Sequence, residues 1–207
     1  NYDQKSNTFT IDAYDFTTLE KTKTLFNSKN FSELEGIDDY SINKTDDKIL
    51  IATSSTPIYR HSFTAVYYLY DIKTNTLTKV SNNAIQEPLL TADGSKIAYA
   101  FENNLYVFDV NKNTTVQVTK DGVYNKIING ITDWVYEEEF AFVRAFDWNA
   151  DGTQLAFIRF DESDVPTFSM DVYGKELYPT QQVFKYPKAG EKNSKVSLHI
   201  YDAKKAS

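Results

Sequence analysis

The stretch NGITDWVYEEEF, residues 129 to 140, places three glutamates in a row beside a tryptophan and a tyrosine. Adjacent carboxylates repel one another, so Glu137, Glu138 and Glu139 would be stabilised by a nearby positive charge. An ammonium group is a suitable partner, because carboxylates accept charge-assisted hydrogen bonds from it at about twice the strength of neutral ones. The stretch therefore predicts a cation-binding site. The alternative is a solvated loop with no partner.

Arginine is scarce in this chain, with Arg60, Arg144 and Arg159 against nineteen lysines. Arg60 lies among aromatic residues in YRHSF, and its planar guanidinium could bridge a carboxylate and a carbonyl oxygen. A salt bridge at a sheet edge is the plainer interpretation. The only histidines, His61 and His199, lie in or near predicted strands, and we expect both to be structural. No His/Asp/Glu spacing predicts a metal site.

Two adjacent glutamates can share one ammonium only from certain backbones. Neighbouring side chains point to opposite faces of a strand, whereas on a helix they diverge by about 100°. Asp133 can cap a helix that starts at Trp134. We therefore predict a helix of one to two turns over 134–141, which projects Glu138 and Glu139 into a cavity.

The composition favours a β-rich domain and excludes some partners. The chain has 207 residues and a net charge of −7, with 41% hydrophobic and 15% aromatic residues. Aromatic and β-branched residues favour strands. The acidic balance argues against nucleic acid and anionic membranes as partners. There is no cysteine, and no apolar run approaches the roughly 20 residues of a membrane span. No cofactor is expected.

A sequence unit repeats along the chain. An Asp-containing turn precedes an apolar strand in DDKILIATSS (46–55), DGSKIAYAFENN (93–104) and DGTQLAFIRFDE (151–162). A strand ending in aspartate, a polar turn and another strand recur in YLYDIKTNTLTKVS (68–81) and LYVFDVNKNTTVQVT (105–119). Repeating strands joined by short turns are typical of four-stranded propeller blades. A β-sandwich is the alternative, but sandwiches do not repeat a sequence unit.

We therefore predict an all-β fold, a partial β-propeller of four-stranded antiparallel blades with a short helical insertion near 134–141. Propellers typically close with four to eight blades, so the chain is expected to be a fragment of one propeller domain. Its expected parts are a blade remnant (1–37), two blades (38–83 and 84–122), an insertion (123–143) and an incomplete blade (144–207).

At NGITDWVYEEEF the chain closely resembles the N-terminal propeller of the dipeptidyl peptidase IV group, of bacterial type, in the prolyl oligopeptidase family of serine peptidases. Three further stretches support this resemblance in the same order: YRHSFTAVYYLYDI (59–72), DGSKIAYAFENNLYV (93–107) and YPKAG (186–190). The resemblance covers most of the chain and is weakest over residues 1–35. DWVYEEE is its specific part, because the DG-strand repeats occur in many propellers.

The resemblance implies a serine exopeptidase that releases X-Pro or X-Ala dipeptides from a free N-terminus. By position, Glu138 and Glu139 would bind the substrate's α-ammonium, and Glu137 would be structural or solvent-facing. Residues 123–143 would be a substrate-anchoring insertion. Arg60 would hold a substrate backbone carbonyl. After the glutamates, FAFVRAFDWNADG runs one residue shorter than the mammalian pattern, so no pocket residue beyond the acidic pair is transferred.

The catalytic serine, aspartate and histidine would lie in a C-terminal α/β-hydrolase domain that this chain does not contain, and the chain has no G-x-S-x-G motif. The chain alone is expected to be inactive. The resemblance also implies export to a bacterial periplasm or cell surface, and exposed blade edges leave open a homodimer. Two other functions stay open: a non-catalytic propeller that binds a partner, and part of a prolyl tripeptidyl peptidase.

Overall fold

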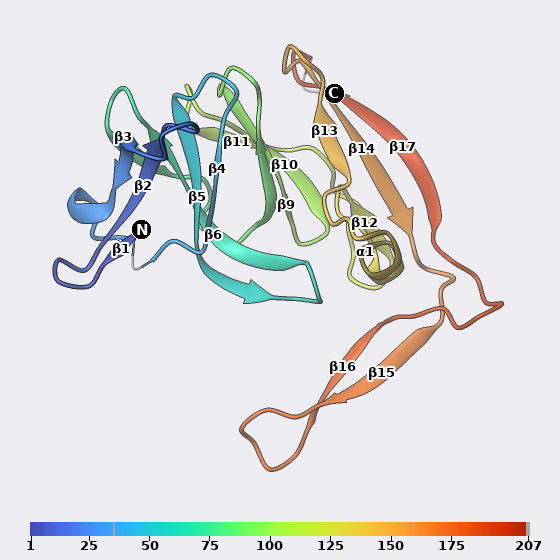
Figure 1. Cartoon of the computed structure of the whole chain (residues 1–207). Helices are drawn as coiled ribbons and strands as arrows, with labels where there is room; N and C mark the ends of the chain where they lie inside the picture. Colours follow the sequence, from blue (N-terminus) through green and yellow to red (C-terminus); the bar gives the residue numbers. More distant parts are fainter. Residues whose placement is uncertain (35, 206–207) are drawn as a thin grey trace.

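Strands dominate the computed structural model, which describes residues 1–34 and 36–205 (Figure 1). Two of the expected ranges reach beyond this part, since Glu35 falls in 1–37 and the final two residues fall in 144–207. The described part contains no helix long and apolar enough to cross a membrane. The predicted all-β, partial-propeller fold with one short helix is confirmed.

The strands form successive antiparallel sheets, and in the first three of them the strands that follow one another along the chain pair with each other. The first sheet contains β1 (Tyr2–Asp3), β2 (Thr8–Tyr14) and β3 (Lys21–Asn27), followed by the 3-10 helix η1 (Ser28–Asn30). The second contains β4 (Asp39–Ile42), β5 (Lys48–Pro57), β6 (Phe63–Asp71) and β7 (Thr76–Lys79). The third contains β8 (Gln86–Leu90), β9 (Lys96–Phe101), β10 (Asn104–Asp109) and β11 (Thr114–Gln117).

The fourth sheet is built around one long strand, β14 (Gln154–Asp161). It pairs with β12 (Ile127–Asn129), β13 (Phe146–Trp148) and β17 (Lys195–Asp202). Between β14 and β17 the chain leaves this sheet and forms a separate hairpin of β15 (Thr167–Val172) and β16 (Thr180–Lys185). This hairpin projects away from the sheets (Figure 1).

The repeated sequence unit has a repeated turn as its physical basis. Asn43, Thr91 and Asn149 occupy equivalent positions, and each side-chain oxygen accepts hydrogen bonds from the backbone N–H groups four and five residues later. In the second and third of these turns a glycine three places later has a positive φ, +68° at Gly94 and +65° at Gly152. A residue without a Cβ atom adopts that conformation readily.

The core lies between the faces of adjacent sheets. Along β5, Ile49 and Ile51 pack in a cluster with residues of the first sheet, whereas Leu50 and Ala52 pack in a cluster with residues of the third. All four side chains are buried. This division follows from the two-residue period of a strand, and full burial of each large aliphatic side chain contributes about 1.5–3 kcal/mol. The second sheet therefore packs against the first sheet with one face and against the third sheet with the other. The loops that connect the strands lie outside this core.

The helix α1 (Trp134–Phe140) lies in the connection between two strands of the fourth sheet, after β12 and before β13 (Figure 1). The predicted range 134–141 exceeds the helix by one residue, because Ala141 has a φ of +54° and ends it. Tyr136 packs edge-on against the fully buried Phe160 of β14, with ring centroids 5.0 Å apart. The helix is therefore attached to the fourth sheet through its apolar face.

Candidate functional site

The acidic stretch is helical because Asp133 caps its start. The Asp133 carboxylate accepts a hydrogen bond from the backbone N–H of Tyr136 at 3.0 Å, as the sequence predicts for an N-cap. Its other oxygen accepts a hydrogen bond from the Ser194 hydroxyl group, just before β17. The cap thus fixes both where α1 begins and how it is oriented on the fourth sheet.

Replacing Asp133 with alanine should lower the free energy of unfolding by about 1 kcal/mol, because one helix N–H and the Ser194 hydroxyl lose their acceptor. Asp133→Asn keeps a capping oxygen and is the matched control, with a loss of a few tenths of a kcal/mol. Urea unfolding followed by the fluorescence of Trp134 and Trp148, the only tryptophans, measures both values. Equal loss in the two variants would contradict the capping role.

The three glutamates of α1 have three different environments. Glu137 lies one turn after Asp133 and is 1% exposed, Glu138 is partly buried, and Glu139 is exposed. The roughly 100° step between helical neighbours produces this divergence. Each of the three carboxylates therefore has its own degree of burial.

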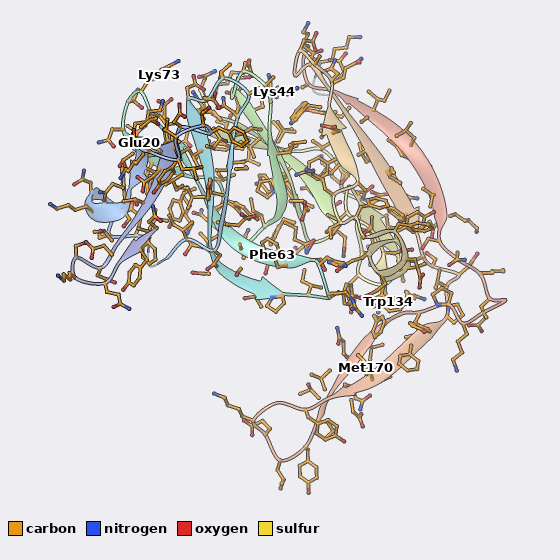
Figure 2. The ribbon with its side chains drawn as sticks, in the orientation of Figure 1. Glu20, Lys44, Phe63, Lys73, Trp134 and Met170 are labelled. Carbon is orange, nitrogen blue, oxygen red and sulfur yellow. The ribbon has the colours of Figure 1, made fainter. Side chains whose placement is uncertain are left out.

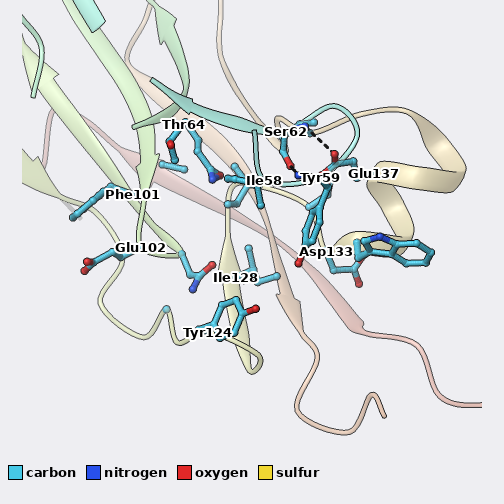
Figure 3. Close-up of a pocket in the computed structure, with 18 of the residues that line it drawn as sticks. Ile58, Tyr59, Ser62, Thr64, Phe101, Glu102, Tyr124, Ile128, Asp133 and Glu137 are labelled. Carbon is cyan, nitrogen blue, oxygen red and sulfur yellow. Dashed lines mark hydrogen bonds between the residues drawn. The ribbon is translucent and has the colours of Figure 1, made fainter. Parts of the chain in front are cut away.

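Glu137 binds the backbone of a loop far away in the sequence. Its Oε1 atom accepts hydrogen bonds from the N–H groups of His61 and Ser62, each at 2.8 Å. Figure 3 shows the bond from Ser62. A charged acceptor makes these bonds stronger than neutral ones. The sequence interpretation left Glu137 as structural or solvent-facing, and the structure places it in the structural role. Of the residues at this site, it is the one whose importance the sequence reasoning missed.

The loop that Glu137 binds connects β5 to β6 and comprises residues 58–62, called here the Arg60 loop. It closes on itself, since the N–H of Ile58 donates to the Ser62 carbonyl at 2.8 Å and that of Tyr59 donates to the Ser62 hydroxyl at 3.3 Å. A β-bulge in β5 near Ser54 bends the hairpin, which reaches towards α1 (Figure 1). The hairpin and the helix thus meet at the tip residue, Arg60.

Arg60 and Glu138 form a salt bridge at this meeting point. Arg60 Nε lies 2.8 Å from Glu138 Oε2, with the arginine side chain 71% exposed and the glutamate side chain 17% exposed. Such an exposed pair contributes about 0.2–1 kcal/mol, so its main effect is to orient both groups. The two terminal guanidinium nitrogens make no hydrogen bond within the described residues. They stay available for an acceptor such as a carbonyl oxygen.

Glu139, the next residue of α1, forms no salt bridge within the described part of the chain. It lines a small surface groove with Trp134 and Tyr186, where α1 meets the base of the β15–β16 hairpin. The Trp134 ring packs against Tyr186 with centroids 4.6 Å apart, and Figure 2 shows Trp134 above the hairpin that carries Met170. The structure therefore brings Arg60 and Glu138 together, whereas the Glu139 carboxylate has no hydrogen-bond or salt-bridge partner among the described residues.

A cavity of about 590 Å³, called here the inner cavity, lies behind the Arg60 loop (Figure 3). Tyr59 and Glu137 line it, but Arg60, Glu138 and Glu139 do not. Burial raises the pKa of the Tyr59 hydroxyl, and nearby acidic groups raise it further. Within residues 1–34 and 36–205, no group of three or more His, Cys, Asp or Glu side chains is arranged to hold a metal ion.

Comparison with known proteins gives consistent matches. The family described as "Dipeptidyl peptidase IV (DPP IV) N-terminal region" matches residues 43–207. The crystal structure of Porphyromonas gingivalis dipeptidyl peptidase 4 superposes with a TM-score of 0.90 and 40% identity, over 96% of this chain and 29% of that one. This similarity extends over all the sheets that position the site.

Two curated relatives are similar over much of the chain. Prolyl endopeptidase FAP of Mus musculus is 35% identical over 167 residues, which are 79% of this chain and 22% of that protein. The probable dipeptidyl-aminopeptidase B of Chaetomium globosum is 37% identical over 171 residues, 75% of this chain and 18% of that protein. The chain thus spans about a fifth of the length of these relatives.

Proposed function

The chain belongs to the family of the dipeptidyl peptidase IV N-terminal region, and from this premise we propose that it is the substrate-anchoring part of a serine exopeptidase. The whole enzyme releases X-Pro and X-Ala dipeptides from peptides with a free N-terminus. Glu138 and Glu139 bind the substrate's α-ammonium group. Arg60 binds a backbone carbonyl oxygen of the same substrate.

The observation that carries this proposal is the salt bridge between Arg60 and Glu138, with the exposed Glu139 as the next residue of the same helix. A donor fork and two carboxylates complement the first residue of a peptide, which has an ammonium group and, three bonds from its nitrogen, a carbonyl oxygen. An internal peptide nitrogen has neither the charge nor the three donors. A peptide bound through its middle would offer no positive charge to the two carboxylates.

The catalytic half of the enzyme lies outside this chain in the proposal. A C-terminal α/β-hydrolase domain of the same polypeptide supplies the serine nucleophile, histidine base and aspartate, and the isolated chain is inactive. The names of the relatives and the small share of their length that this chain covers support this division. The similarity to a bacterial protein supports location in the periplasm or at the surface of a bacterium.

We also propose a division of the chain into parts of one propeller. The second and third sheets lie within the proposed blades 38–83 and 84–122, and the anchoring insertion 123–143 contains β12 and α1. The remnant is 1–37 and the incomplete blade is 144–207. On β17, Leu198 and Ile200 are 71% and 62% exposed, an apolar row that suits packing against a further sheet.

A homodimer is proposed through the β15–β16 hairpin. Large apolar side chains on its strands and tip are exposed, with Tyr173, Leu177 and Tyr178 at 75%, 87% and 78%. Contact with a second copy of the protein would bury these exposed apolar side chains of the hairpin. In sedimentation of the full-length protein, Leu177→Lys should shift the dimer towards monomer, and unchanged sedimentation would contradict this interface.

The length of the released product tests the proposed function. The full-length protein should cleave X-Pro chromogenic substrates, with a much lower kcat/KM for X-X-Pro substrates and for proline within a blocked peptide. Preferred cleavage of X-X-Pro would support a tripeptidyl peptidase. Efficient cleavage of blocked peptides would support an endopeptidase, the activity in the name of the mouse relative. No cleavage of any of them would leave a non-catalytic binding propeller.

A further inference from the structure

The inner cavity has the size and lining of a small-molecule site. Its volume of about 590 Å³ falls within the range of roughly 300–1,000 Å³ typical of ligand pockets, which are mostly apolar with a few polar groups. The apolar wall includes Ile58, Phe101, Ile128, Ile131, Trp134 and Val143. The ionisable groups that face it are Tyr59, Glu102, Tyr124, Asp133, Glu137, Glu162 and Lys185.

Most of these polar groups already have partners in the protein. Asp133 caps α1, Glu137 binds the Arg60 loop, and the Tyr124 hydroxyl donates to the Val183 carbonyl at 2.7 Å. The Lys185 ammonium donates to the Val165 carbonyl at 2.7 Å. These groups form part of the cavity wall, but their hydrogen-bonding atoms already have partners in the protein and do not require a ligand.

Among the buried ionisable groups of the lining, Glu162, directly after β14, is the exception. It is 5% exposed, its backbone is held by hydrogen bonds to Lys126 and Val165, and its carboxylate accepts no hydrogen bond from any described residue. Burial raises its pKa to about 7, and the neighbouring charge of Asp133 raises it while Lys185 lowers it. A buried carboxylate without a partner is costly and is stabilised when a cation binds it.

A second unpaired group faces the same cavity. The Oε1 atom of Gln86 is buried and has no hydrogen-bond partner among the described residues. This atom, like the carboxylate of Glu162, is a hydrogen-bond acceptor. Two unpaired acceptors within an apolar wall select a ligand that brings its own donors and an apolar body.

We propose that the inner cavity binds a protonated primary amine on an apolar stem, with the Glu162 carboxylate as its ion-pair partner. The Gln86 carbonyl oxygen provides a second acceptor. Two kinds of molecule carry such an amine, namely a free small molecule and a peptide with a lysine side chain. The site rests on Glu162 alone among charged groups and does not depend on the anchoring role of Glu138 and Glu139, which do not line the cavity.

The test uses the full-length protein carrying Glu138→Gln and Glu139→Gln, so that the proposed anchor does not contribute to amine binding. Calorimetry at pH 8 compares 2-phenylethylamine with 2-phenylethanol, which has the same stem and no charge. We expect the amine to bind at least about tenfold tighter, and Glu162→Gln to remove that preference. Glu20→Gln, on an exposed loop before β3, is the control and should keep it.

Binding of amine and alcohol with equal affinity, no binding of the amine, or a preference that survives Glu162→Gln would overturn the proposal. If Glu162→Gln does not fold, the pH dependence decides. Amine binding should weaken by about tenfold from pH 8 to pH 6 as Glu162 gains its proton, and pH-independent binding would count against the site. Tighter binding of Nα-acetyl-lysine methylamide than of 2-phenylethylamine would identify a peptide side chain as the source, and the reverse a free amine.

Discussion

Replacing Glu137 with leucine should lower the free energy of unfolding by about 2–5 kcal/mol, because the N–H groups of His61 and Ser62 lose their acceptor. Each buried donor left without a partner costs about 1–3 kcal/mol. Leucine fills much of the space, so the loss reports the hydrogen bonds more than a cavity. Urea unfolding of the chain, followed by tryptophan fluorescence, measures it.

Two matched variants make this result specific. Glu137→Gln keeps one acceptor oxygen and should lose less stability than Glu137→Leu. Glu139→Gln changes an exposed glutamate two residues further along the helix and should alter the free energy of unfolding by less than about 0.5 kcal/mol. If Glu137→Leu were as stable as the Glu139 variant, the hydrogen bonds to the Arg60 loop would not be important for stability.

Glu138→Gln and Glu139→Gln should reduce kcat/KM of the full-length enzyme for an X-Pro substrate. At least one of them should lose about 2 kcal/mol or more of transition-state stabilisation, which is about 30-fold. Glutamine keeps the shape and an oxygen acceptor of glutamate but removes the charge that pairs with the ammonium group.

The two variants separate direct anchoring from the positioning of Arg60. Glu138→Gln also weakens the salt bridge to Arg60, whereas Glu139→Gln leaves it intact. A loss in the Glu139 variant therefore reports contact with the ammonium group alone. Glu20→Gln is the control and should keep wild-type kcat/KM. Wild-type activity in both Glu138→Gln and Glu139→Gln would refute the anchor assignment.

Local pattern was enough to predict the sheets and the helix. The apolar alternation of the DG repeats corresponds to β5, β9 and β14, and their turn residues do have the side-chain acceptors that hold the chain reversal. Asp133 before an aromatic and acidic run was enough to place the start of α1. These features depend on residues a few positions apart, so one sequence contains them.

The different contacts of the three glutamates could not be predicted from local sequence pattern. Glu137, Glu138 and Glu139 are chemically identical neighbours, and only the Arg60 loop, more than 70 residues earlier, distinguishes them. Its position depends on the bulge in β5 and on the stacking of three sheets. The same holds for Glu162. The sequence shows only that it follows a strand, whereas its burial beside the inner cavity depends on the packing of distant segments.

The central claim is that this chain selects substrates by their free α-ammonium group. Its most direct test measures kcat/KM of the full-length enzyme for an X-Pro substrate and for its Nα-acetylated form, in the wild type and in the Glu138→Gln, Glu139→Gln double variant. We predict a strong preference for the free amine in the wild type, reduced at least about 30-fold in the double variant. An equal preference in both enzymes would contradict the account.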